Sequence, residues 1–144
     1  MKTIRREALL PFSALQMFEL VDDIEKYPEF LPNCQGAKVL SRDLNEVVAT
    51  LSVAKGSFSK DFTTCNTNTP SKSIEMQLLD GPFKHLKGRW DFQELGQKAC
   101  KIQLVVEFEF SNILSNMMFG TIFNQMAESF VEAFSQRARE VYVA

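Results

Sequence analysis

The last part of the chain has the hydrophobic spacing of an amphipathic helix. At about 100° per residue its large apolar side chains fall in one arc, which holds Phe119, Ile122, Phe123, Met126, Ala127, Phe130 and Phe134. The opposite face holds Asn124, Glu128, Glu132, Ser135 and Arg139. The pattern predicts a helix that begins near Ser111 or Asn112, either of which can cap it, and ends at Tyr142. Gly120 inside it predicts a kink, a break into two helices, or a close approach of backbone.

Between Gly36 and Phe110 the apolar residues alternate instead. In KIQLVVEFEF one face holds Ile102, Leu104, Val106, Phe108 and Phe110, and in HLKGRWDFQ one face holds Leu86, Trp90 and Phe92. His85, Lys87, Arg89 and Asp91 face the other way. Weaker strands are expected at about 37–42, 46–54, 57–67 and 73–80, between turn-prone segments. The pattern predicts an antiparallel meander of about six strands with one apolar face.

The N-terminal segment predicts a strand followed by a short helix. Residues 2–9 end at Pro11, which favours an edge strand. Ser13 and Gln16 have the spacing of a capping box, and Phe12 with Met17 that of a hydrophobic staple. We expect the helix to run through Asp23 and to stop before Pro28, because a residue that precedes proline avoids the helical region.

This order of elements predicts an α+β fold. A sheet with one apolar face needs a cover, and the C-terminal helix is the element long enough to supply it. We therefore expect a curved antiparallel sheet wrapped around that helix. With 144 residues and 45% hydrophobic residues, the chain fits a single domain over 1–144.

Charge and targeting signals narrow the function. The formal net charge is -2, so the chain lacks the overall positive field that draws proteins to nucleic acid. We expect no DNA partner, and any RNA contact must be local. Charges at positions 2, 5, 6 and 7 exclude a signal peptide or a transmembrane segment at the N-terminus, which favours the cytoplasm. Three widely spaced cysteines, Cys34, Cys65 and Cys100, predict reduced and mostly buried thiols.

The sequence offers little catalytic chemistry. Its single histidine, His85, falls on the polar face of a strand, and no cysteine or histidine spacing suits a metal. The glycines form no nucleotide-binding motif. Asp22 and Asp23, at the end of the first predicted helix, are explained by a loop amide or a nearby lysine. We expect no catalytic residue, no metal site and no required cofactor.

Two segments instead suggest an apolar cavity. EKYPEFLPNC, residues 25–34, interleaves Tyr27, Phe30 and Leu31 with two prolines, so it forms either a plug at one end of the sheet or the gate of a cavity. In LLDGPFKHLKGRWDF, Gly88 lies on the apolar face and leaves room above the sheet. Phe119 or Phe123 can fill that room, or it can remain as pocket volume.

Together the motifs resemble a known family. PFSALQMFELVDDIEKYPEFLPNC, DGPFKHLKGRWDF, and FEFSN followed by FGTIFNQMAESFVEAFSQRAREVY are similar to the RatA-type ribosome association toxins, relatives of the mitochondrial coenzyme Q-binding START-domain proteins. The resemblance covers essentially the whole chain. It implies a helix-grip (START-like) fold with an apolar cavity between the sheet and the helix.

The resemblance implies two functions on different surfaces. Binding of ubiquinone or a similar isoprenoid lipid would use the inner residues Tyr27, Phe30, Leu31, Trp90, Phe108, Phe119, Phe123, Met126 and Phe130. Attachment to the large ribosomal subunit, which blocks its joining with the small one, would use the outer cations Lys84, Lys87, Arg89, Lys98 and Lys101 through phosphate contacts. The alternative for these cations is a solvated strand face. The toxin name also implies an antitoxin partner.

Other interpretations remain open at this stage. One is a ubiquinone-binding chaperone that supports respiration without acting on ribosomes. A second is a polyketide cyclase-like enzyme, which is disfavoured because the predicted inner positions are nearly all apolar. For the C-terminal stripe, a membrane anchor is disfavoured by the mixed charge of the opposite face. We expect the stripe to pack near Phe134 and to line a cavity at Phe119, Phe123 and Met126.

Overall fold

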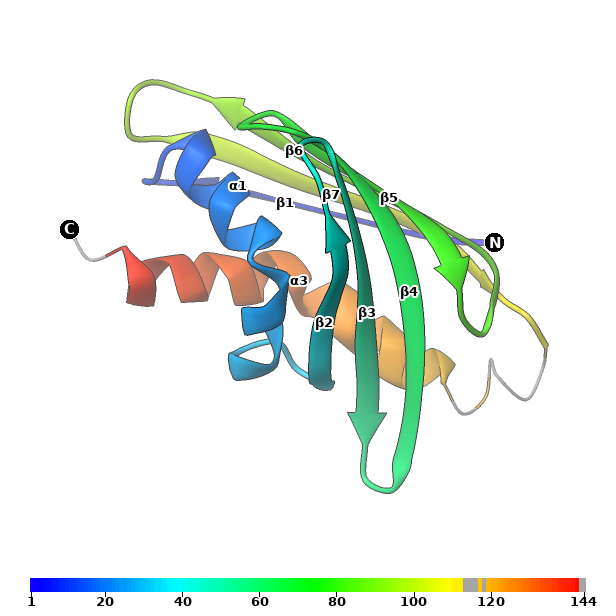
Figure 1. The fold of residues 1–144 in the computed structure, drawn as a ribbon. Coiled ribbons are helices and arrows are strands. Elements are labelled where there is room, and N and C mark those ends of the chain that lie inside the picture. Colours follow the sequence, from blue (N-terminus) through cyan, green and yellow to red (C-terminus); the bar gives the residue numbers. More distant parts are fainter. Residues whose placement is uncertain (113–116, 118, 143–144) are drawn as a thin grey trace.

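Seven strands form one antiparallel sheet in the order β1-β7-β6-β5-β4-β3-β2 (Figure 1). The computed structural model describes residues 1–112, 117 and 119–142. The strands are β1 (Lys2–Leu10), β2 (Cys34–Arg42), β3 (Glu46–Lys55), β4 (Phe58–Thr69), β5 (Ser73–Asp80), β6 (Phe83–Glu94) and β7 (Cys100–Phe110). The helices are α1 (Ala14–Asp22), the 3-10 helix η1 (Ile24–Glu29) and α3 (Gly120–Val141).

The sheet curves around α3, which lies along its concave face (Figure 1). The alternation read from the sequence determines which side chains point inward: Ile102, Leu104 and Phe108 on β7 are at most 1% exposed, as is expected of the apolar face. The predicted α+β helix-grip fold and its six-strand meander after β1 are confirmed.

The chain crosses from one edge of the sheet to the other through α1 and η1. β1 is an edge strand that pairs with β7, as predicted, whereas β2 forms the opposite edge. The capping box that begins α1 is also confirmed: Gln16 N donates to Ser13 Oγ over 3.1 Å, and Ser13 N donates to Gln16 Oε1 over 2.9 Å.

The segment after α1 differs from the predicted loop. Residues 24–29 form a 3-10 helix that contains Pro28, so Tyr27 does lie in a helical turn. Such a turn places residues i and i+3 on one side, and here it buries both Ile24 and Tyr27. Its hydrogen bonds are donated on either side of the proline, by Lys26 N to Asp23 O and by Phe30 N to Tyr27 O. Pro28 is therefore tolerated without a donor.

The predicted C-terminal helix is present as α3. α3 starts at Gly120, the residue expected to mark a kink or break, and ends at Val141. The expected start at Ser111 or Asn112 leads into 113–116, which lie outside the described residues. Ser135, expected on the polar face, is buried. Its hydroxyl donates to the Val131 carbonyl over 2.7 Å, which satisfies it inside the helix.

Candidate functional site

A small cavity lies between the concave face of the sheet, η1 and α3. Its volume is about 60 Å³. The sheet contributes Ala49, Leu51, Phe62, Thr64, Asn66, Met76, Leu86, Gly88, Trp90 and Val106, and the helices contribute Ile24, Tyr27, Phe123, Phe130 and Phe134. The described wall is therefore mostly apolar, and its polar groups belong to Thr64, Asn66, the Tyr27 hydroxyl and the Trp90 indole N–H.

The predicted inner residues divide into two groups. Tyr27, Trp90, Phe123 and Phe130 line this cavity. Phe30, Leu31, Phe108, Phe119 and Met126 do not belong to its wall. The expectation that the C-terminal stripe packs near Phe134 is confirmed, because this side chain is 0% exposed and packs against other aromatic rings, although it also lines the cavity. The expectation that Phe119 and Met126 line the cavity was wrong, since neither belongs to its wall.

Closely packed aromatic rings explain why the cavity does not extend to Phe119. The ring centroid of Phe83 lies 5.3 Å from that of Phe119 and 4.9 Å from that of Phe123, with interplanar angles of 85° and 70°. Phe108 lies 5.0 Å from Phe123, also edge to face. Offset and edge-to-face pairs at these distances are the favourable arrangement of aromatic rings. They fill the end of the sheet next to the N-terminus of α3, so the cavity is confined to the region from Phe123 to Phe134.

Phe30 packs against α3 and is not part of the cavity wall. Its ring centroid lies 5.1 Å from that of Phe134, and the guanidinium carbon of Arg137 lies 5.1 Å from the Phe30 centroid. Arg137 also pairs with Glu29 over 2.6 Å, and this partner lowers the pKa of the Glu29 carboxyl. A cation–π contact and an ion pair, both from Arg137, thus hold the end of η1 against α3.

Gly88 creates room in the floor of the cavity, as predicted, but a different residue uses it. A Cβ atom on Gly88 would lie 2.6 Å from Met76 Cε, so the tip of Met76 occupies the space above the glycine. Neither Phe119 nor Phe123 is among its nearest neighbours. Because methionine is unbranched and flexible, this part of the wall is the easiest to rearrange.

The polar groups in the wall were missed by the sequence analysis. Thr64 Oγ1 donates to Asn66 Oδ1 over 2.9 Å, and the Tyr27 hydroxyl donates to the Val21 carbonyl. Burial, together with the charge of Asp22, raises the pKa of Tyr27, so this hydroxyl stays protonated. The signal was present in FTTCNTNT, where Thr64, Asn66 and Asn68 share the phase of the buried Phe62. A polar residue in the apolar phase of a strand indicates a buried polar site.

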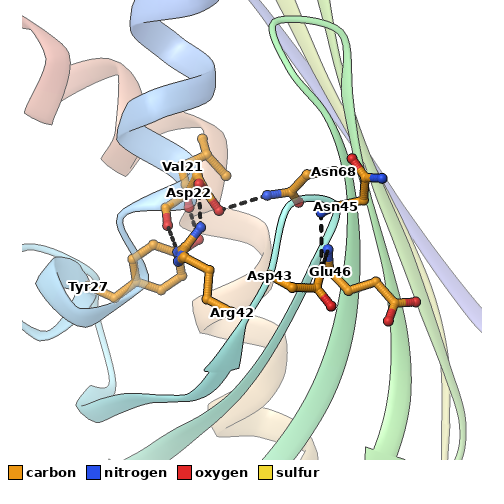
Figure 2. A network of polar contacts seen from close by, with 8 residues as sticks. All are labelled: Val21, Asp22, Tyr27, Arg42, Asp43, Asn45, Glu46 and Asn68. Atoms are coloured by element: carbon orange, nitrogen blue, oxygen red, sulfur yellow. Dashed lines mark hydrogen bonds and ion pairs between the residues drawn. The ribbon is translucent and has the colours of Figure 1, made fainter.

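Asp22 joins the end of α1 to two strands of the sheet (Figure 2). Arg42 Nη1 donates to Asp22 Oδ2 over 2.8 Å, and Arg42 Nη2 donates to the Asp22 carbonyl over 3.0 Å. Asn68 Nδ2 donates to Asp22 Oδ1 over 3.0 Å. The expected partner of Asp22 was a loop amide or a lysine, whereas the actual partners are an arginine and a side-chain amide. We call Asp22, Arg42 and Asn68 the Asp22 clamp. The clamp holds the end of α1 against β2 and β4, directly before η1, which carries the cavity residues Ile24 and Tyr27.

Replacing Asp22 with alanine is expected to lower the free energy of unfolding by about 1–3 kcal/mol, as measured by urea denaturation. Most of this loss should come from the Asn68 amide, which is buried and would lose its acceptor. The Arg42 pair contributes less because the Arg42 side chain is 43% exposed. Glu19→Ala, an exposed acid on α1, is the matched control, and an equal effect of both variants would contradict the role of the clamp.

The five cations assigned to ribosome binding lie on the outer face of β6, β7 and their connecting turn. Three of them have acidic partners. Lys84 pairs with Glu109 over 3.4 Å, Lys101 with Glu7 over 3.2 Å, and Arg89 with Glu75 and Asp91. Lys87 and Lys98 have no ion-pair partner among the residues described. The face therefore carries mixed charge rather than a continuous positive patch.

In residues 1–112, 117 and 119–142 no group of His, Cys, Asp or Glu side chains is placed to hold a metal ion. None of the helices in these ranges combines the length and apolar character that a membrane crossing requires.

Comparison with known proteins places this geometry in a family. Residues 10–135 match the family described as polyketide cyclase/dehydrase and lipid transport. The ribosome association toxin RatA of Vibrio cholerae is 50% identical over 142 residues, 99% of each chain. RatA of Escherichia coli K12 is 46% identical over 144 residues, 100% of this chain and 91% of the relative. The chain belongs to the RatA family of START-like proteins.

The chain is also similar, more distantly, to another sequence relative and to two solved structures. The mitochondrial coenzyme Q-binding protein coq10 of Schizosaccharomyces pombe is 24% identical over 140 residues, 94% of this chain and 85% of the relative. Among solved structures, the Zhui aromatase/cyclase of Streptomyces sp. R1128 superposes with a TM-score of 0.85 at 15% identity, covering 99% of this chain and 96% of that one. A START superfamily protein of Mycobacterium smegmatis gives 0.78 at 20% identity, over 96% and 98%. At these identities the two structures establish the shared fold alone. The close relatives of the RatA family are named as toxins, not enzymes.

Proposed function

We propose that this chain is a non-enzymatic, START-like ribosome association protein of the bacterial cytoplasm. It binds the large ribosomal subunit and blocks joining with the small subunit. The observation that carries this proposal is the 46–50% identity to RatA proteins along nearly the whole chain. An antitoxin that counteracts the chain would be its protein partner.

The unpaired cations Lys87 and Lys98 are the best candidates for contacts with ribosomal RNA. A lysine without an acidic partner can neutralise a phosphate without first breaking an ion pair. Arg89 is less available because it is held by Glu75 and Asp91. The outer face of β6 and β7 would thus contact RNA at a few separate phosphates.

Reversal of both charges, Lys87→Glu with Lys98→Glu, is expected to weaken co-sedimentation with isolated large subunits about tenfold or more. The slope of log affinity against log salt should also become shallower by roughly 0.7–0.9 for each lost contact. Lys60→Glu with Lys72→Glu is the matched control, because it changes the net charge equally at exposed lysines elsewhere. Equal weakening by both pairs would indicate a net-charge effect, and unchanged binding of the first pair would remove this face from the interface.

We also propose that the cavity binds ubiquinone or a similar isoprenoid lipid. The apolar wall favours this second function, and so does the similarity to a coenzyme Q-binding protein. The present volume of about 60 Å³ is smaller than the roughly 150 Å³ of an engineered cavity that admits benzene, so a ring can enter only if part of the wall moves. Native mass spectrometry of freshly purified protein tests the proposal. A retained lipid supports it, whereas bare protein that also fails to take up added short-chain quinone overturns it.

A further inference from the structure

Asn66 places a polar side chain deep in the apolar cavity. The residue is 7% exposed, belongs to the concave face of β4 and lines the cavity. Among the described residues of the wall, two others carry side-chain oxygen atoms, and both donate their hydroxyl protons within the protein. Thr64 donates to Asn66 Oδ1, and Tyr27 donates to the Val21 carbonyl.

The hydrogen bond from Thr64 fixes which end of the Asn66 amide remains available. Because Oδ1 accepts the threonine proton over 2.9 Å, the Nδ2 group is the free end of the amide. Within the described part of the chain, Nδ2 donates to no acceptor. Buried amide groups are normally hydrogen-bonded, so this donor is suited to an acceptor brought by a ligand.

We propose that Asn66 Nδ2 donates a hydrogen bond to a carbonyl oxygen of an apolar ring ligand, an inference that rests on the proposed lipid binding. The chemistry of the wall selects this class of ligand. A carboxylate or phosphate would be buried here without a cation, which is strongly unfavourable. A ketone or quinone oxygen accepts from this donor and brings no proton of its own that would need a further partner in the wall.

The sheet places space for such a ring next to the amide. Asn66 pairs with Met76 on β5, and Met76 pairs with Gly88 on β6, so the three residues form one row across the concave face. Neighbouring strands are about 4.8 Å apart, so the row spans roughly 10 Å from Asn66 to Gly88. When the tip of Met76 swings away from Gly88, a flat ring can lie over the glycine with its carbonyl directed toward Asn66.

Calorimetric titration of the full chain with two probes tests the proposal. One probe is a benzoquinone with a decyl tail, and the other is decylbenzene, which lacks the carbonyl groups. The wild-type chain is expected to bind the quinone about tenfold more tightly, which is the effect of one hydrogen bond of about 1.4 kcal/mol. Asn66→Leu, of similar size, should lose this preference while its affinity for decylbenzene changes less than about twofold. Thr67→Val, on the opposite face of β4, is the control and should keep the preference.

The outcomes separate this inference from lipid binding itself. Equal affinity of the wild-type chain for both probes, or an unchanged preference in Asn66→Leu, overturns the role of Asn66 and leaves lipid binding standing. Failure of both probes to bind overturns both proposals. If Asn66→Leu does not fold, Thr64→Val decides the question. Without its hydroxyl the amide can rotate, so the preference should fall about threefold, and an undiminished preference overturns the assignment.

Discussion

Alanine in place of Phe123 is expected to remove about 3–5 kcal/mol from the free energy of unfolding. The side chain is 2% exposed, and its ring contacts Phe83 at 4.9 Å, Phe108 at 5.0 Å and Phe62 at 5.8 Å. Truncation removes these contacts and leaves a void, because the surrounding rings belong to different strands and cannot collapse together. Since a domain typically has only about 5–15 kcal/mol of stability, this loss is a large share of the total.

Urea denaturation of the two proteins measures the effect. Leu44→Ala provides the control, since that side chain is 90% exposed and its truncation should change stability by less than about 0.5 kcal/mol. A loss below about 1 kcal/mol for Phe123→Ala would mean that this ring does not stabilise the packing of α3 against the sheet. Because Phe123 also lines the cavity, the same variant should take up larger apolar guests than the wild-type chain.

The second large effect is a loss of stability at alkaline pH. Burial raises the pKa of Cys34 from its ordinary value of 9.0 to about 11. Burial, aided by the charge of Glu94, raises the pKa of Cys100 to about 11 as well. The folded state therefore holds both protons more tightly than the unfolded state. The two thiols do not change the free energy of unfolding well below pH 9. As the pH rises from 9 toward 11, each thiol lowers it by about 1.4 kcal/mol per pH unit. The two thiols together should remove about 5 kcal/mol by pH 11.

Unfolding curves recorded at several pH values between 8 and 11 check this expectation. The double variant Cys34→Ala with Cys100→Ala should show a much shallower decline. Cys65→Ala, which removes a less buried thiol, should decline nearly as steeply as the wild-type chain. Tyr27, whose pKa is also raised by burial, adds a further decline above pH 10 that Tyr27→Phe should remove. Parallel curves for all these variants would show that the thiols and the phenol do not control the transition.

The sequence was sufficient to predict the fold because several of its elements have strong local signals. The alternation in KIQLVVEFEF corresponds to β7, and the capping box at Ser13 and Gln16 begins α1. The boundaries that moved are those set by tertiary contacts. β2 begins at Cys34 rather than near residue 37 because Cys34 pairs with Val53. Likewise η1 forms around Pro28 because its helical turn buries Ile24 and Tyr27 together.

The cavity was harder to place than the fold. Helical spacing assigned Phe119, Phe123 and Phe134 to one face, but it cannot show which of them meet other rings. That depends on Phe83 and Phe108, which the sheet brings from distant positions in the sequence. The space above Gly88 was predictable from a missing side chain, whereas its occupation by Met76 depends on the register of β5 against β6. The partners of the outer cations depend on strand register in the same way.

The pairing of β1 with β7 also determines when the fold can be completed. Lys2 pairs with Phe108 and Leu10 with Cys100, so more than half of the chain separates the two partners in sequence. Contacts this distant form slowly, because the entropy of closing the intervening chain is lost before the contact stabilises anything. During synthesis, β1 therefore remains without its partner strand until β7 has been translated.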